Sequence, residues 1–265
     1  MGKVSISAAW EGAKQVLATD GRLLVPVALA LFVLPGLVLD LAVPDAPPGK
    51  LPPAGLWIAV ACLAFLVSLA GQLAVIRLAM GPAISVGEGI AHGMRRVLPY
   101  VGAVLMWMLP FVLIAGLLVS RIAADPQSPS PGASLGLLLL TAVGLFAAMR
   151  LMLASPVASA ERVGPVAILA RSWRLTRGNW WRMFGFFVMF LIGAFVLLIA
   201  VQAVFGLLVS LFTDVTPKSL GWFLVRIVAQ LLSAMLSTIF FVMLARIYLQ
   251  VSGRGEPQVS VPSSN

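Results

Sequence analysis

The side chains that could catalyse a reaction are few and scattered along the chain. It carries one histidine, His92, and nine acidic residues. Metal-assisted hydrolysis needs several carboxylates or histidines that converge on one ion. Only Glu88 and His92 lie one helical turn apart, and such a pair on a polar helix face is typically a solvated contact. No Gly-rich phosphate loop or nucleophile elbow occurs. The sequence therefore predicts no catalytic residue, no metal site and no cofactor.

Arginines and tryptophans gather in one segment, GPVAILARSWRLTRGNWWRMFGFF, at residues 164–187. At about 100° per residue, Arg171, Arg174 and Arg177 share one arc of a short helix. Arginine can place two donors on one phosphate, and tryptophan is enriched at membrane interfaces. The segment indicates contacts with lipid headgroups, or else an orientation signal alone. The candidate residues are Arg171, Trp173, Arg174, Arg177, Asn179, Trp180, Trp181 and Arg182.

The composition is typical of a membrane protein. Of 265 residues, 61% are hydrophobic and 10% are charged, and the mean hydropathy is +1.06. Soluble domains carry about 25% charged residues. The net charge of +9 does not indicate a nucleic-acid partner, because the arginines flank apolar stretches rather than covering a polar domain. The single cysteine, Cys62, excludes an intrachain disulfide.

Six apolar stretches approach or exceed the roughly 20 residues that cross a bilayer. Short amphipathic segments precede the first, third and fifth of them, and the starts of these segments are about 80 residues apart. The pattern predicts an all-α membrane protein with three repeats, each an interfacial amphipathic helix followed by a transmembrane helix pair. Convergence on a common membrane pattern is the alternative to duplication. The expected spans are 23–43, 56–80, 100–120, 135–157, 183–212 and 220–249.

The repeat units are expected at about 5–80, 85–158 and 164–252, within one integral-membrane domain that covers 1–252. The segment 253–265 has the composition of a disordered cytoplasmic tail. Cationic residues dominate the side that holds both termini, whereas Lys50, Arg121 and Lys218 lie on the other side. Short loops rich in Lys and Arg stay in the cytoplasm. Both termini are therefore expected to be cytoplasmic.

Polar residues inside the apolar spans are a second set of candidates, because such residues are costly in lipid and often functional. Arg226, Gln230, Ser233 and Ser237 form one stripe on the last span. Such residues either form hydrogen bonds between helices or line a transport path. Asp40 lies at a depth similar to that of Arg226, so the two are expected to pair or to share a polar pocket with Gln230. The full set is Asp40, Gln72, Gln202, Arg226, Gln230, Ser233 and Ser237.

Two stretches, SWRLTRGNWWRMFG at 172–185 and ARIYLQVSG at 245–253, resemble the integral-membrane domain of some bacterial glycerophosphodiester phosphodiesterases. The soluble catalytic barrel of those enzymes is absent from this sequence. The resemblance implies a stand-alone, multi-pass protein of the bacterial cytoplasmic (inner) membrane. We expect a non-catalytic scaffold or lipid-contacting accessory module, whose partners are membrane lipids, including anionic phospholipids, and an unidentified membrane protein. The alternative is a transporter of small solutes or lipids that uses the polar stripe of the sixth span.

Overall fold

The computed structural model is all-helical over the residues that it describes, which are 4–44, 52–81, 84–124, 130–216 and 219–253. Six of its helices are long and apolar enough to cross a membrane, so the predicted all-α membrane fold is confirmed. The elements are α1 (Ile6–Ala28), a π-helical segment η1 (Leu29–Val33), α2 (Leu34–Ala42), α3 (Leu56–Met80), α4 (Val86–Ala123), α5 (Pro131–Leu151), α6 (Ala154–Ala160), α7 (Pro165–Leu175), α8 (Trp180–Ser210) and α9 (Leu220–Ser252).

Some sequence predictions concern residues outside the described ranges. These are the placement of Lys50 and Lys218, parts of the loops at 45–51, 125–129 and 217–218, and all but the first residue of the expected tail at 253–265.

Side chains at the helix starts determine where the helices begin. Ser5, Ser130 and Ser219 each accept a hydrogen bond from a backbone N–H of the first turn that follows. Such capping satisfies N–H groups that have no partner inside the helix. α4 has a full capping box, in which Ser85 and Glu88 bond each other's backbone N–H groups. Helices α1, α4 and α7 begin at Ile6, Val86 and Pro165, but this spacing alone does not establish a duplication, and the repeat stays a prediction.

Among the described residues, a short helix separate from the following span is present only in the third unit, where α7 precedes α8, so the arrangement expected for the first two units is not seen. Residues 6–42 form one continuous helical rod, and α4 runs uninterrupted from Val86 to Ala123. Pro26 and Pro99 lie inside helices, which membrane helices accommodate; the irregularity near Pro26 is the π-helical segment η1 rather than a break. Only Gly178, with φ at +84°, turns the chain between an amphipathic helix and a span.

The span expected at 135–157 lies within the candidate span Pro131–Ala160, which the structure divides into two helices. α5 ends at Leu151, and the separate short helix α6 follows. Residues 154–159 of α6 are all buried, and the Ser159 hydroxyl donates to the Leu73 carbonyl of α3 over 3.0 Å. Small side chains allow this close packing of helix on helix.

α3 is the centre of the bundle, and it packs against α1, α2, α4, α6 and α9. Its buried residues are concentrated in its second half, from Leu69 to Ala79. α3 and α4 approach most closely at Gly93, where an added Cβ would lie 2.3 Å from the Ala70 carbonyl oxygen. Only glycine fits at such a backbone-to-backbone contact. This crossing fixes the start of α4 against the end of α3.

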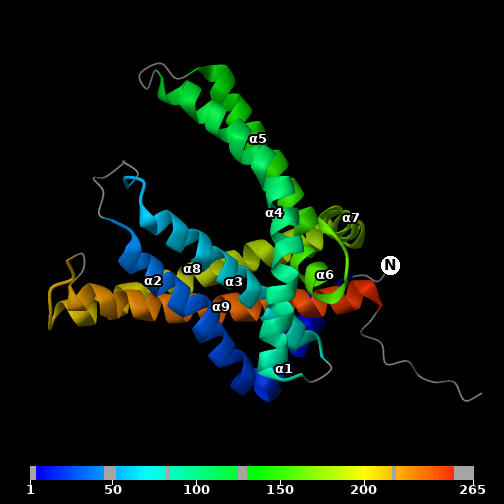
Figure 1. Cartoon of the computed structure of the whole chain (residues 1–265), viewed down its shortest axis with the longest axis horizontal. Helices are drawn as coiled ribbons and strands as arrows, with labels where there is room; N and C mark the ends of the chain where they lie inside the picture. Colours follow the sequence, from blue (N-terminus) through cyan, green and yellow to red (C-terminus); the bar gives the residue numbers. More distant parts are fainter. Residues whose placement is uncertain (1–3, 45–51, 82–83, 125–129, 217–218, 254–265) are drawn as a thin grey trace, which may run out of the picture.

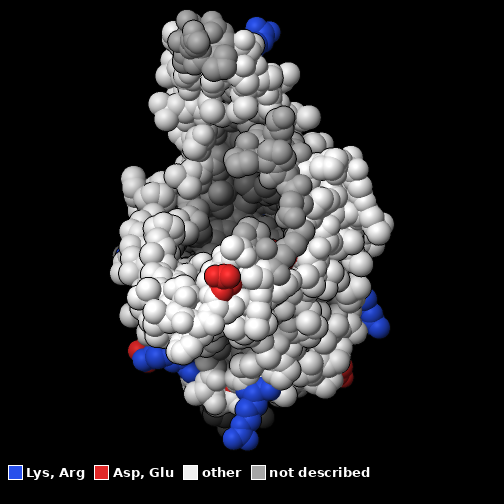
Figure 2. All heavy atoms as spheres, turned by 90° about the vertical axis from the view of Figure 1, so that its left-hand side faces the viewer, with Lys and Arg blue, Asp and Glu red and all other residues white. Residues whose placement is uncertain are grey.

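Three helical hairpins extend from this common base (Figure 1). They are formed by α1–α2 with α3, by α4 with α5, and by α8 with α9, and their outer ends diverge. Viewed from the side of these outer ends, the surface is hollowed between the hairpins, and its walls are largely uncharged (Figure 2). Large apolar side chains such as Leu117, Phe195 and Phe212 are exposed on the outer parts of the hairpins. Such surfaces suit acyl chains rather than water.

Candidate functional site

The arginine-rich segment at 171–182 is anchored to the rest of the protein near both ends. The Nε of Arg171 lies 3.3 Å from Oε1 of Glu161. Arg182 donates to the Val4 carbonyl over 3.0 Å. Asn179 begins α8, but its side chain does not cap that helix; instead it accepts a hydrogen bond from the Val4 N–H at 3.2 Å. These three predicted lipid contacts therefore have partners within the protein.

The middle of the segment faces outward. Arg174 and Arg177 are exposed, and neither side chain has a hydrogen bond or ion pair with the described residues. Trp181 is 76% exposed and Trp173 is 40% exposed. The face of α7 that packs on the bundle is formed by Ile168, Ser172 and Leu175. The structure thus divides the predicted set into residues that bond to the rest of the protein and an exposed basic and aromatic surface, which we call the α7 surface: Trp173, Arg174, Arg177 and Trp181.

Trp180 belongs to an aromatic cluster under this surface. Its ring stacks on Phe184 with centroids 5.1 Å apart, and Phe146 of α5 lies 5.7 Å away. The guanidinium of Arg150 lies over the rings of Phe146 and Trp173, at 5.3 and 5.4 Å. Nε and Nη1 of Arg150 and the indole N–H of Trp180 are buried without hydrogen-bond partners among the described residues. Cation–π attraction compensates part of this cost for Arg150.

The expected polar contact between the first and last spans is present at the outer part of the bundle. Arg226 of α9 forms an ion pair with Asp40 of α2, and Nε2 of Gln230 lies 3.5 Å from the same carboxylate. The side chain of Asp40 is 15% exposed and that of Arg226 is 44% exposed. Gly36 lies against the Gln230 amide, because a Cβ there would be 2.7 Å from its nitrogen. These residues join α2 to α9.

The other intramembrane candidates do not join this contact. Gln72 of α3 lies 3.4 Å from the hydroxyl of Tyr100 in α4, so it links two neighbouring helices. Gln202 of α8 is exposed, whereas Ser233 and Ser237 are half-buried. Within the stripe predicted on α9, Arg226 and Gln230 therefore contact Asp40. Ser233 and Ser237 do not extend this contact along the helix.

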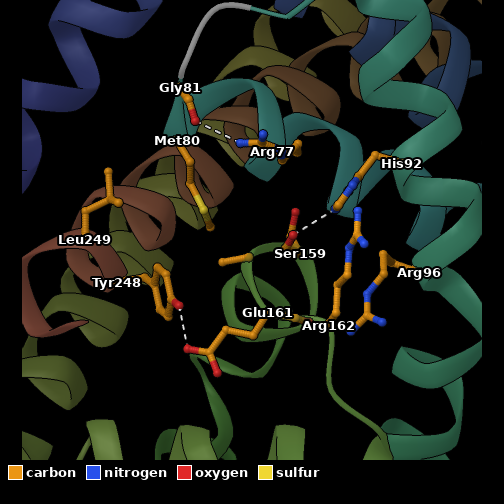
Figure 3. Close-up of a pocket in the computed structure, with 11 residues that line it drawn as sticks. Arg77, Met80, Gly81, His92, Arg96, Ser159, Glu161, Arg162, Tyr248 and Leu249 are labelled. Carbon is orange, nitrogen blue, oxygen red and sulfur yellow. Dashed lines mark hydrogen bonds between the residues drawn. The ribbon is translucent and has the colours of Figure 1, made fainter. Parts of the chain in front are cut away.

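A polar cavity of about 640 Å³ lies at the end of the bundle where the described chain begins and ends. Its walls come from α3, α4, α6, the α6–α7 connector and α9, and it contains three arginines, Arg77, Arg96 and Arg162 (Figure 3). Met80 and Leu249 form an apolar part of its wall. Its only carboxylate among the lining residues is Glu161, which accepts the Tyr248 hydroxyl at 2.8 Å and also pairs with Arg171 outside the cavity.

Hydrogen bonds to the backbone hold the cavity residues in place. Arg96 donates to the carbonyls of Ala158, Glu161 and Val163 at 2.9, 2.6 and 2.9 Å, and so fixes the connector between α6 and α7. Arg77 donates to the Gly81 carbonyl at 2.8 Å. Arg162 is exposed and forms no hydrogen bond or ion pair with the described residues.

His92 lies in the first turns of α4, before the apolar stretch that begins near Tyr100. Its Nε2 is 2.8 Å from the Ser159 carbonyl; because a carbonyl only accepts, Nε2 carries the proton. Burial lowers the pKa of His92, and the positive charges of Arg77, Arg96 and Arg162 lower it further, against the opposing effect of the Ser159 hydrogen bond. The imidazole is therefore neutral near pH 7. Glu88 bonds Ser85 instead of His92, so the two form no acid–base pair.

The cavity was not predicted as a site from the sequence. Arg77, Arg96 and Arg162 are among the cationic residues that were expected only to orient the chain. Each of these arginines lies near the end of an apolar helix or directly beside one. This repeated position was the feature of the sequence that could have indicated a shared site. What the sequence could not supply is the α3–α4 crossing at Gly93, which brings them together.

Comparison with known proteins gives one match. Residues 129–260 match the model for the membrane domain of glycerophosphoryl diester phosphodiesterase. Residues 129–260 belong to this family of membrane domains. The match includes α5 to α9, and so it contains both stretches on which the resemblance was based. No curated protein and no solved structure was found to match.

The family assignment concerns a membrane domain, and it does not bring a catalytic domain with it. The matched half supplies Ser159, Glu161, Arg162 and Tyr248 of the cavity, whereas Arg77, His92 and Arg96 come from the other half. No group of three or more His, Cys, Asp or Glu side chains lies together in the described part of the chain.

Proposed function

We propose that this multi-pass protein is a non-catalytic, lipid-contacting module of the bacterial cytoplasmic membrane, with both termini in the cytoplasm. The α7 surface meets anionic phospholipid headgroups, and the splayed hairpins provide a membrane scaffold for a partner. The observation that carries this proposal is the exposure of Arg174 and Arg177, without protein acceptors in the described chain, beside Trp181. Arginine and tryptophan at the membrane interface contact phosphates and the headgroup region respectively.

The same arginines would also serve as a simple orientation signal, and a substitution to lysine distinguishes the two roles. Orientation needs only positive charge, whereas a forked contact with phosphate needs the guanidinium. We expect the double variant Arg174→Lys/Arg177→Lys to retain several-fold less phosphatidylglycerol than the wild type, measured by native mass spectrometry of the purified protein. Arg22→Lys is the matched control, because Arg22 is also exposed and lies outside the arginine-rich segment. Unchanged lipid retention in the double variant would leave orientation as the only role of these arginines.

The transporter alternative is less well supported. It requires the polar stripe on α9 to face an open path, but Arg226 and Gln230 lie against Asp40. Contacts of this kind support a role in helix packing.

A further inference from the structure

We infer that the cavity between α3, α4, α6 and α9 is a binding site for a phosphoryl group. This site is separate from the α7 surface and uses different residues. The shared chemistry is a phosphate ester that carries at least one negative charge, whether it belongs to a lipid headgroup or to a soluble molecule.

The charge balance of the cavity favours an anion. Three guanidinium groups line it against one carboxylate, and that carboxylate is shared with Tyr248 and with Arg171 outside the cavity. Like charges held together in a partly enclosed space repel one another. A bound anion would relieve this repulsion, so its binding is favoured by the fold itself.

The donors available in the cavity also suit phosphate oxygens. Arg162 has no hydrogen bond to the described residues. Arg77 donates one N–H to the Gly81 carbonyl, and its other N–H groups are available to a ligand. Arg96 is held by three carbonyls, so it contributes mainly a fixed positive charge. Arg77 and Arg96 are held in place by these bonds before a ligand binds, and such pre-organisation lowers the entropic cost of binding.

The cavity has room for a ligand of this kind. A volume of about 640 Å³ lies within the range of roughly 300–1,000 Å³ that small-molecule sites occupy. A second cavity of about 310 Å³ shares Arg77 and His92 with it and adds Arg95 and Glu88. Met80 and Leu249 offer an apolar wall to the carbon part of a phosphate ester.

Arg162→Gln is the decisive variant, because this side chain has no structural bond in the described chain whose loss would unfold the protein. Binding is measured with two probes: sn-glycerol 3-phosphate, by calorimetry on protein in phosphatidylcholine nanodiscs, and phosphatidylglycerol, by native mass spectrometry. The loss of one charge-assisted hydrogen bond should weaken binding about tenfold. Arg22→Gln removes the same charge outside the cavity and should change affinity less than twofold.

The two probes distinguish the source of the phosphoryl group. A tenfold loss seen with phosphatidylglycerol alone assigns the site to a lipid headgroup, and a loss seen with sn-glycerol 3-phosphate assigns it to a soluble ester. The inference is overturned if neither probe binds, if Arg162→Gln leaves both affinities unchanged, or if Arg22→Gln weakens binding equally. Arg77→Gln should reproduce the loss. The cavity variants leave the α7 surface intact, so they do not test the lipid contacts proposed there.

Discussion

Arg226 in α9 forms an ion pair with Asp40 in α2, 186 positions earlier in the sequence. The pair joins the first and last membrane helices near the outer side of the bundle. Each of the two charges stabilises the fold only while the other is present, because a single charge would be left uncompensated in an apolar setting.

Removing one member of this pair should therefore matter more than removing both. We expect Arg226→Leu to destabilise the protein less when Asp40→Asn is present, with a coupling free energy on the order of 0.5–3 kcal/mol. Thermal unfolding of the four proteins of the cycle in detergent measures it. Strictly additive effects would show that the pair contributes no interaction energy.

Gly93→Ala should be strongly destabilising. The new Cβ would lie 2.3 Å from the Ala70 carbonyl oxygen, so α3 and α4 would have to separate. Overpacking of this kind typically costs about 1–3 kcal/mol, and the arginines of the cavity would move apart. Gly87→Ala is the control, since it lies on the same helix with no atom within 4 Å of the added Cβ. Equal melting temperatures for the two variants would contradict the close crossing.

Two arginines with contrasting surroundings give the next prediction. Arg96→Met removes three hydrogen bonds from a charged donor, which should cost several kcal/mol in all, at about 1.5–3 kcal/mol for each bond. The Glu161 carbonyl keeps the Val163 N–H as a donor. Arg150→Met removes two buried N–H groups that had no partner in the described chain. Only the cation–π contacts are lost there, so about 2 kcal/mol or less is expected. Chemical unfolding of both variants measures the two losses in the free energy of unfolding. A larger loss for Arg150→Met than for Arg96→Met would contradict the prediction.

The orientation of the chain is also testable. We expect Arg121→Cys to react with a membrane-impermeant maleimide in intact cells and Arg174→Cys to react only after lysis. Both variants are made in a Cys62→Ser background, because Cys62 is exposed on the structure. Labelling of position 174 without labelling of position 121 in intact cells would place the termini on the outside.

The sequence was sufficient to predict the spans, because lipid imposes a length and an apolar composition on each of them. It also predicted the pairing of Asp40 with Arg226, since two charges at one depth in lipid have few other ways to be compensated. The sequence did not predict where the backbone stays helical. Residues 18–22 and Pro99 lie inside continuous helices, whereas the chain turns at Gly178 after α7.

Tertiary structure gives the three arginines of the predicted arc different surroundings. Arg171, Arg174 and Arg177 were assigned to one surface from angular spacing alone. Angular spacing cannot show that Glu161, on another segment, reaches Arg171. For the same reason the cavity was not predicted: its arginines come from separate elements that only the crossing at Gly93 brings together.

The divergence of the three hairpins from a narrow base (Figure 1) has a mechanical consequence for the surrounding bilayer. In a membrane, a body of this shape occupies more area in one leaflet than in the other, and lipids adapt to the shape of the protein that they surround. Crowded copies then favour a bilayer that is convex on the side of the outer loops. The divergent hairpins would in this way make the protein a wedge within the bilayer.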